Sequence, residues 1–199
     1  MKPVRVVSGR MVPLDRADVD TDQIMPKQFL KRIERTGFGE FVFHDWRAQD
    51  DFVLNDPRYD GANILVTGPN FGSGSSREHA PWGLQQYGFE AIVAPSFADI
   101  FRNNCGKIGL LCVQLPEKTV RALSDLATDH PQTEAIVDLT TQHLSAGPVE
   151  ADFAFDAHTR HMLMEGLDAI SLTLERDARI TEFERSRPDW LPVTTQPGA

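Results

Sequence analysis

Residues 62–115 read ANILVTGPNFGSGSSREHAPWGLQQYGFEAIVAPSFADIFRNNCGKIGLLCVQL and carry the pattern that decides the fold. Apolar runs with the composition of buried strands alternate here with segments of helical character. The predicted strands are 62–67, 90–94 and 109–115, and the predicted helices between them are 82–87 and 97–105. Alternation of this kind with short loops favours parallel strand pairing. The sequence therefore predicts an α/β fold with a layered core.

The chain on either side of this block is predicted to add strands and helices to the same core. No linker is long enough to divide the chain, and no internal repeat is present. The further expected elements are a strand at 4–12 broken near Gly9, a loop at 13–26, an amphipathic helix at 27–35, a helix at 117–129, strands at 133–139 and 149–155, and helices at 156–163 and 167–183. We expect one domain over residues 1–187, followed by a Pro-rich, flexible tail at 188–199.

Composition narrows the function classes. The 199 residues include 20 Lys and Arg against 29 Asp and Glu, which gives a formal net charge of -9. Nucleic-acid binding needs clustered positive charge, so an acidic chain argues against it. Only two cysteines are present, Cys105 and Cys112, which excludes a disulfide framework. The sequence shows no signal-type apolar segment and no apolar run of membrane-spanning length, so we expect a cytoplasmic protein with no membrane association.

The loop after the first strand of this block has the features of an anion site. It reads GPNFGSGSSREHAP over residues 68–81 and contains three glycines in its first seven positions. Glycine lets the backbone approach a ligand closely, and the start of a following helix offers unpaired N–H groups. Arg77 adds a charged fork suited to a carboxylate or phosphate. Lys31, Arg32 and Arg35 form a second candidate anion contact.

Three interpretations of this loop compete on the residues alone. Ser75 and Glu78 fit the S-x-x-E capping box, so both could simply close a helix start. A phosphate cradle is disfavoured because the loop lacks the Walker lysine and a third glycine at the required spacing. A carboxylate-binding catalytic loop is the third possibility, with a serine as base and with Arg77 stabilising negative charge. Pro81 belongs in the first turn of a helix and leaves residues 75–77 free to face a ligand.

Four separated motifs carry a resemblance to a known family. They are GPNFGSGSSREHAPWGL at 68–84, DVDTDQIMPKQFLKRIERTGFG at 18–39, FHDWR at 43–47 and PSFADIFRNNCGKIGLL at 95–111. Together they resemble the small subunits of bacterial 3-isopropylmalate dehydratases, which are similar to the swivelling fourth domain of aconitase. The resemblance runs through most of residues 1–185 and implies a single β/β/α swivelling domain. It also implies isomerisation of 2-isopropylmalate to 3-isopropylmalate, by dehydration and rehydration, in leucine biosynthesis.

The resemblance further implies roles for individual residues. Ser75 matches the family's catalytic base, Arg77 its carboxylate-binding arginine, and Ser76 a contact to the same carboxylate, with Gly74 beside them. Asp22 matches an acidic residue of the active site, although the sequence leaves open whether Asp20 or Asp22 fills that place. The segment that selects the substrate's side group is expected at Phe29, Leu30, Lys31, Arg32 and Ile33. Which of these side chains face the substrate is not set by their spacing.

The chemistry of dehydration agrees with an active site that is shared between two chains. Loss of hydroxide needs a Lewis acid, and an iron–sulfur cluster needs three or four thiolates. Two separated cysteines cannot supply them, and His79, His158 and His161 do not form a convincing metal site, so we expect no metal in this chain. The resemblance implies a large subunit carrying a [4Fe-4S] cluster as the partner and a small dicarboxylate as the substrate. The alternatives are a related hydro-lyase acting on homoaconitate, citraconate or methylcitrate, or a noncatalytic anion-binding module.

Overall fold

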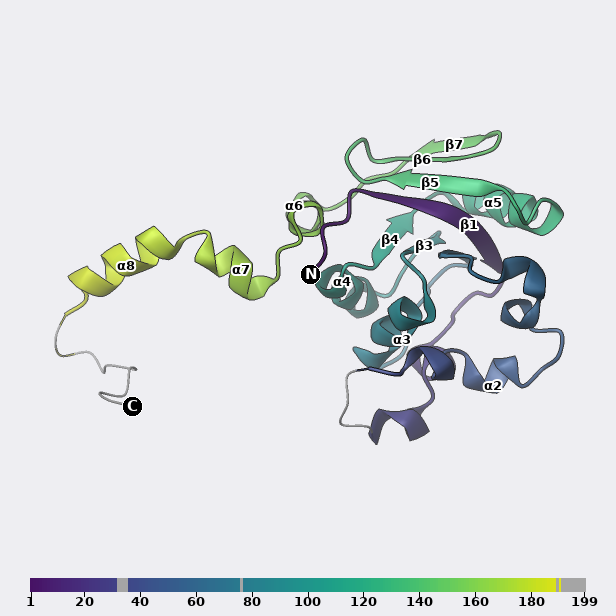
Figure 1. Ribbon diagram of the computed structural model, residues 1–199, viewed down its shortest axis with the longest axis horizontal. Coiled ribbons are helices and arrows are strands. Elements are labelled where there is room, and N and C mark those ends of the chain that lie inside the picture. Colours follow the sequence, from purple (N-terminus) through teal and green to yellow (C-terminus); the bar gives the residue numbers. More distant parts are fainter. Residues whose placement is uncertain (32–35, 76, 189, 191–199) are drawn as a thin grey trace.

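A computed structural model describes residues 1–31, 36–75, 77–188 and 190 of the chain (Figure 1). Seven strands form one sheet in the order β4-β3-β2-β1-β5-β6-β7. The strands are β1 Val6–Leu14, β2 Ile64–Thr67, β3 Ala91–Ala94, β4 Leu111–Gln114, β5 Glu134–Asp138, β6 His143–Ala146 and β7 Val149–Asp152. Strands β1 to β4 pair in parallel, and β5 to β7 continue the sheet from β1 in antiparallel pairs.

The long strand β1 joins the two halves of the sheet. Its residues 6–10 pair with β5, and its residues 11–14 pair with β2. The change of partner falls next to Gly9, where the sequence predicts a break, but the strand runs through this position without interruption. The predicted break is therefore wrong, and the glycine instead lies at the boundary between antiparallel and parallel pairing.

Helices cover both faces of the parallel half. They are α1 Thr21–Ile24, α2 His44–Arg47, α3 His79–Tyr87, α4 Asp99–Ile108, α5 Glu117–Asp129, α6 Ala157–Glu165, α7 Ala169–Leu174 and α8 Asp177–Ser186. Single 3₁₀ turns lie at Lys27–Lys31, Gly39–Phe41, Val53–Asn55 and Pro57–Tyr59. None of the helices described here combines the length and apolar character needed to cross a bilayer.

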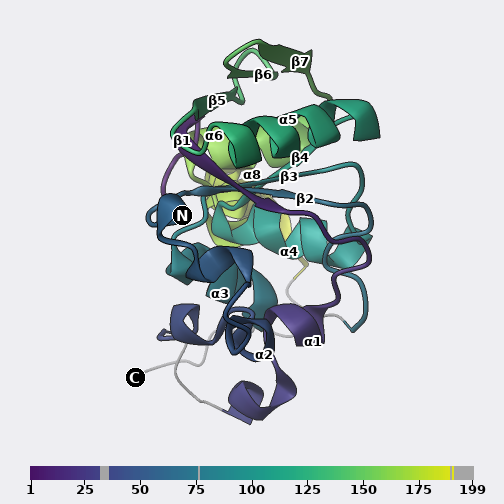
Figure 2. The same ribbon diagram turned by 90° about the vertical axis from the view of Figure 1, so that its right-hand side faces the viewer.

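The core has two parts, one on each face of the sheet. Figure 2 shows α5 on one face, with β6 and β7 beyond it, and α3 and α4 on the other. Helix α5 contacts β1, β2 and β3 and also β7, so the sheet curls around it. The part of the core on the side of α3 and α4 is rich in aromatic side chains, and Phe38, Phe43, Phe71 and Phe89 are fully buried there. Burial of such side chains contributes most of the favourable free energy of folding.

Most elements predicted around the central block are confirmed, some with shifted ends. Helix α5 has the predicted bounds, and the predicted strands at 133–139 and 149–155 correspond to β5 and β7. The predicted loop at 13–26 is wrong in two places: β1 extends to Leu14, and α1 occupies Thr21–Ile24. In the helix predicted at 27–35, Lys27–Lys31 form a 3₁₀ turn, and residues 32–35 lie outside the described part. Strand β6 and helix α2 were not predicted.

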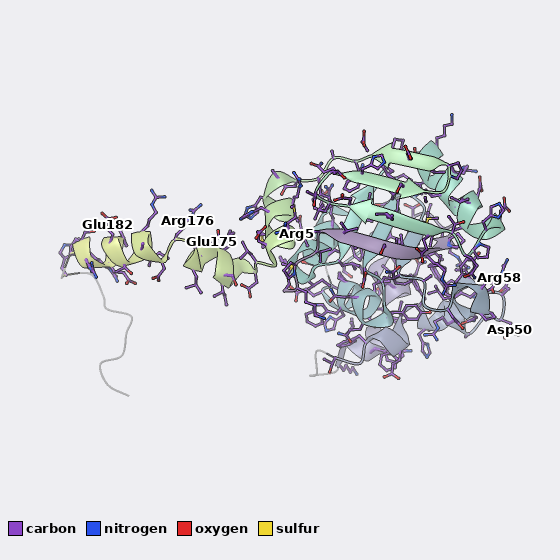
Figure 3. All side chains as sticks on the ribbon, turned by 45° about the horizontal axis from the view of Figure 1, so that its top comes forward. Arg5, Asp50, Arg58, Glu175, Arg176 and Glu182 are labelled. Carbon is purple, nitrogen blue, oxygen red and sulfur yellow. The ribbon has the colours of Figure 1, made fainter. Side chains whose placement is uncertain are left out.

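The C-terminal helices leave the body of the domain. The helix predicted at 167–183 is two helices, α7 and α8, which extend away from the sheet in Figure 1. Glu175, Arg176 and Glu182 project from this arm in Figure 3. Its base is held by α6, where Arg5 forms an ion pair of 2.8 Å with Glu165. Of the predicted tail, residues 189 and 191–199 lie outside the described part.

Gly72 fixes the loop after β2 against α4, and its replacement tests that contact. Gly72 has φ +78°, and a Cβ there would lie 2.1 Å from Cγ of Phe101. Gly61 has a similar φ of +74°, but the nearest atom to its Cβ would be 3.7 Å away. Both substitutions place a residue with a side chain in the left-handed region of backbone conformation, which costs conformational free energy. Only Gly72→Ala adds a steric clash.

We therefore expect Gly72→Ala to lower the free energy of unfolding by about 1–3 kcal/mol more than Gly61→Ala does. Urea denaturation followed by circular dichroism measures both variants. Equal losses in the two would show that the loop moves freely away from Phe101.

Candidate functional site

The candidate site lies at one edge of the sheet, where three parallel strands end. The segments 15–20, 68–78 and 95–98 follow β1, β2 and β3 respectively. The carboxyl ends of parallel strands meet at the same edge, and ligands of open α/β sheets bind there. The topology therefore gathers the glycine-rich loop and the acidic segment of the sequence at one place.

Hydrogen bonds join the three segments to one another. The amide of Asp18 donates to the carbonyl of Pro69 at 2.9 Å, and the side-chain amide of Asn70 donates to Oδ1 of Asp18 at 2.8 Å. On the other side, the amide of Phe71 donates to the carbonyl of Ser96 at 3.1 Å. Asp18 thus fixes the start of the glycine-rich loop.

Helix α1, which lies in the acidic segment, is hydrogen-bonded to the glycine-rich loop. The side chain of Asp20 accepts from the amide of Gln23, and the side chain of Gln23 accepts from the amide of Asp20, which forms a complete capping box. Thr21 donates twice to the loop, from its amide to the carbonyl of Ser73 and from Oγ1 to the carbonyl of Ser75, each at 2.9 Å. The carboxylate of Asp20 thus caps the helix, and the carboxylate of Asp22 takes no part in this cap.

Ser75, Arg77 and Asp22 lie together. Nε of Arg77 donates to Oγ of Ser75 at 3.2 Å, and Nη1 of Arg77 lies 2.6 Å from Oδ1 of Asp22. The side chain of Arg77 is 22 % exposed and that of Asp22 is 50 % exposed. Nη1 is buried, and among the described residues no acceptor meets it in hydrogen-bond geometry, although the ion-pair distance is short. Nη2 of Arg77 also donates to Oδ2 of Asp22 at 3.5 Å, so the carboxylate faces both terminal nitrogens of the guanidinium.

The helix after the loop begins later than a Ser75 cap would require. Helix α3 starts at His79 with Pro81 in its first turn, and Glu78 at the N-cap makes no side-chain capping bond. The capping-box interpretation of Ser75 and Glu78 is therefore wrong. Ser75 is exposed and does not cap the helix. His79 packs beside Phe38 and Trp82, and burial lowers the pKa of its imidazole below the usual value.

A cavity of about 270 Å³ opens beside the serine and the arginine. Its described lining consists of Thr21, Gly72, Gly74, Ser75, Arg77, Ala98, Asp99, Ile100 and Phe101. A second cavity of about 240 Å³ lies between the ends of β1 and β2 and the start of α5. We favour the first as the functional site, because it brings a hydroxyl and a guanidinium to the same space. The segment 98–101 in its wall was not predicted as part of the site.

The predicted side-group segment is only partly described. Phe29 stacks on Phe41 with ring centroids 4.1 Å apart, and both Phe29 and Leu30 pack on the aromatic core. Lys31 is exposed. None of these three is among the described residues that line the cavity, so their contact with substrate stays a prediction. Arg32 and Ile33 of the same segment, and Ser76 of the loop, lie outside the described residues.

The described residues do not fit an iron–sulfur cluster. Cys105 and Cys112 are both buried in the core, and burial raises the pKa of the Cys105 thiol well above its usual value. A cluster needs three or four thiolates that can reach it. In the parts of the chain that the structure describes, no three His, Cys, Asp or Glu side chains gather closely enough to hold a metal ion.

Comparison with known proteins tests the resemblance. Residues 1–118 match the family model of the aconitase C-terminal domain. A small subunit of 3-isopropylmalate dehydratase from Rubrobacter xylanophilus is 53% identical over 192 residues, which cover 96% of this chain and 98% of that protein. The corresponding protein of a Parafrankia species is 55% identical over 194 residues, covering 98% of this chain and 100% of the relative.

A solved structure supports the fold independently. The 3-isopropylmalate dehydratase structure from Methanocaldococcus jannaschii superposes with a TM-score of 0.63 and 22% identity, over 89% of this chain and 98% of that one. At this identity the likeness speaks for the fold alone. The fold class and the family expected from the motifs are thus both confirmed. The chain belongs to the family of 3-isopropylmalate dehydratase small subunits, within the aconitase C-terminal domain family.

Proposed function

We propose that this chain is the small subunit of a hydro-lyase that interconverts 2-isopropylmalate and 3-isopropylmalate in leucine biosynthesis. Its relatives at about 50% identity over nearly the whole chain are named as that subunit. The observation that carries the residue assignment is the contact between Nε of Arg77 and Oγ of Ser75 at 3.2 Å. This contact places a candidate base and a candidate anion-binding group at one cavity.

Arg77 is proposed to bind a substrate carboxylate. Its guanidinium lines the cavity, and in the single chain its Nη1 and Nη2 face the carboxylate of Asp22 at 2.6 Å and 3.5 Å. A carboxylate can accept two parallel hydrogen bonds from such a fork. Asp22 occupies this fork in the single chain and is therefore proposed to hold Arg77 in place until the substrate carboxylate takes up the same position. Ser76 is proposed as a further contact to the same carboxylate.

Ser75 is proposed to move the proton. Removing a proton from carbon next to a carboxylate requires a strong base, and a serine alkoxide is one. The positive charge of Arg77 beside Oγ stabilises the alkoxide relative to the neutral hydroxyl. The C–H bond breaks, Oγ takes the proton, and the hydroxyl group leaves the neighbouring carbon with its electron pair. In the rehydration step Oγ returns the proton to the carbon that lost the hydroxyl group, and hydroxide adds to the carbon that lost the proton, so that the two groups exchange positions.

The rest of the site is proposed to come from a large subunit. Ser75 and Gly74 are exposed, so this chain does not by itself exclude water from the reacting atoms. The described residues also do not fit a metal cluster. A large subunit bearing a [4Fe-4S] cluster would supply the Lewis acid and close the cavity. The side-group segment at 29–33 is proposed to contact the isopropyl group, although Arg32 and Ile33 lie outside the described residues.

Ser75→Ala in the reconstituted two-subunit enzyme is the direct test of the proposed base. We expect kcat with 2-isopropylmalate to fall by at least about 100-fold with subunit assembly unchanged, because general-base catalysis contributes at least this much. Ser145→Ala, on strand β6 in the antiparallel half, serves as the matched control. Steady-state assays with 2-isopropylmalate, citraconate and homoaconitate measure both variants and identify the substrate.

Unchanged turnover by Ser75→Ala would remove the base assignment and favour an anion-binding module. A strong preference for homoaconitate would change the proposed substrate to a tricarboxylate. Turnover by this chain without any partner would contradict the proposed division of the site between two subunits.

Arg77→Lys tests the carboxylate contact. Lysine keeps the charge but loses the planar fork, so KM should rise by about 10–100-fold, which corresponds to one charged hydrogen bond. The control is Arg121→Lys, since Arg121 is 73% exposed on α5 and pairs only loosely with Glu117 at 4.0 Å. Initial-rate kinetics on the reconstituted enzyme give both constants. Kinetics equal to those of the control would place Arg77 outside the substrate site.

A further inference from the structure

Thr21 makes two contacts that none of the site assignments above uses. Its amide donates to the carbonyl of Ser73 and its Oγ1 donates to the carbonyl of Ser75, both at 2.9 Å. These two carbonyls flank Gly74, so one residue holds the chain on both sides of that glycine. Thr21 itself is only 2% exposed, which anchors these contacts in the core.

Gly74 is the point at which the loop needs to be held. It is exposed and has φ +88°, a conformation that glycine adopts without strain but does not prefer over others. Ser75 is also exposed, so packing does not fix its side chain. A rotation at Gly74 would move Oγ of Ser75 away from Nε of Arg77, where the pair now lies at 3.2 Å.

The neighbours of Thr21 have other tasks. The carboxylate of Asp20 caps α1 through the amide of Gln23 at 2.7 Å. The carboxylate of Asp22 pairs with Arg77 at 2.6 Å. The contact to the Ser75 carbonyl comes instead from the hydroxyl of Thr21, which lies between these two residues at the start of α1.

We infer that Thr21 is a positioning residue that sets the place of the Ser75 hydroxyl by holding the carbonyls of Ser73 and Ser75, the residues on either side of Gly74. This inference rests on the proposed role of Ser75 as base. Loss of the hydroxyl leaves the carboxylate-binding fork of Arg77 intact but releases one side of Gly74. The effect of the loss should therefore fall on kcat and not on KM.

Thr21→Val removes the hydroxyl at nearly constant volume. We expect kcat of the reconstituted enzyme to fall by about 10–100-fold, the range for a displaced catalytic group, while KM changes by less than about 3-fold. Thr21→Ser keeps the hydroxyl and should restore kcat to within about 3-fold of the unmodified enzyme. Thr21→Ala gives the same comparison if the valine chain does not assemble.

Thr67→Val is the matched control. Thr67 is also 2% exposed, and its Oγ1 also donates to a backbone carbonyl, that of Arg16, at 3.3 Å. Both valine variants lose a buried hydrogen bond, so both should show a lower melting temperature. Only Thr21→Val should lose kcat beyond the control.

Two results would overturn the inference. One is a kcat for Thr21→Val equal to that of Thr67→Val, and the other is failure of Thr21→Ser to restore kcat. Either outcome would leave the proposed function standing if Ser75→Ala still abolishes turnover. Full turnover by Ser75→Ala would instead remove the assignment of Ser75 as base, on which this inference rests.

Discussion

The pairing of β1 with two different strands is the constraint on which the rest of the molecule depends. The first part of β1 pairs antiparallel with β5, and the second part pairs in parallel with β2. In the second register Leu14 lies opposite Thr67, and each is the last residue of its strand. The acidic segment and the glycine-rich loop therefore leave the sheet side by side. A shift of this register would separate Thr21 from Ser75 and Asp22 from Arg77.

The sequence predicted those parts of the fold that depend on local pattern. The apolar runs that became β2, β3 and β4 are continuous and fully buried for most of their length, and α5 has clear helical spacing. Strand β6 was missed because it has no continuous apolar run: only Leu144 and Ala146 of its four side chains are buried. Its stability comes from pairing with β5 and β7, which no local pattern reports. Helix α1 was missed for a similar reason, since a capping box and contacts to another loop hold its single turn.

The candidate site was predictable in residue types and less so in arrangement. Ser75 and Arg77 came from one loop, but the partner of Arg77 lies 55 residues away in the chain, and only the fold brings the two together. The sequence could not decide between Asp20 and Asp22. The distinction depends on where α1 begins, because the residue before the first turn is used as its cap. Thr21 was not predicted as a site residue, because its role depends on hydrogen bonds to the carbonyls of Ser73 and Ser75 that only the fold brings within reach.

The charges around the cavity explain why one chain is not enough for the proposed reaction. A dicarboxylate substrate carries two negative charges, and the leaving hydroxide adds another. Among the described residues, the cavity wall offers the positive charge of Arg77 and the negative charge of Asp99, and Asp22 pairs with Arg77 at 2.6 Å. One guanidinium can bind one carboxylate, but this group of charges cannot balance a second carboxylate and a hydroxide. Under the proposed mechanism the remaining positive charge must come from the surface that closes over Ser75, so assembly of the two subunits and completion of the electrostatic environment are the same event.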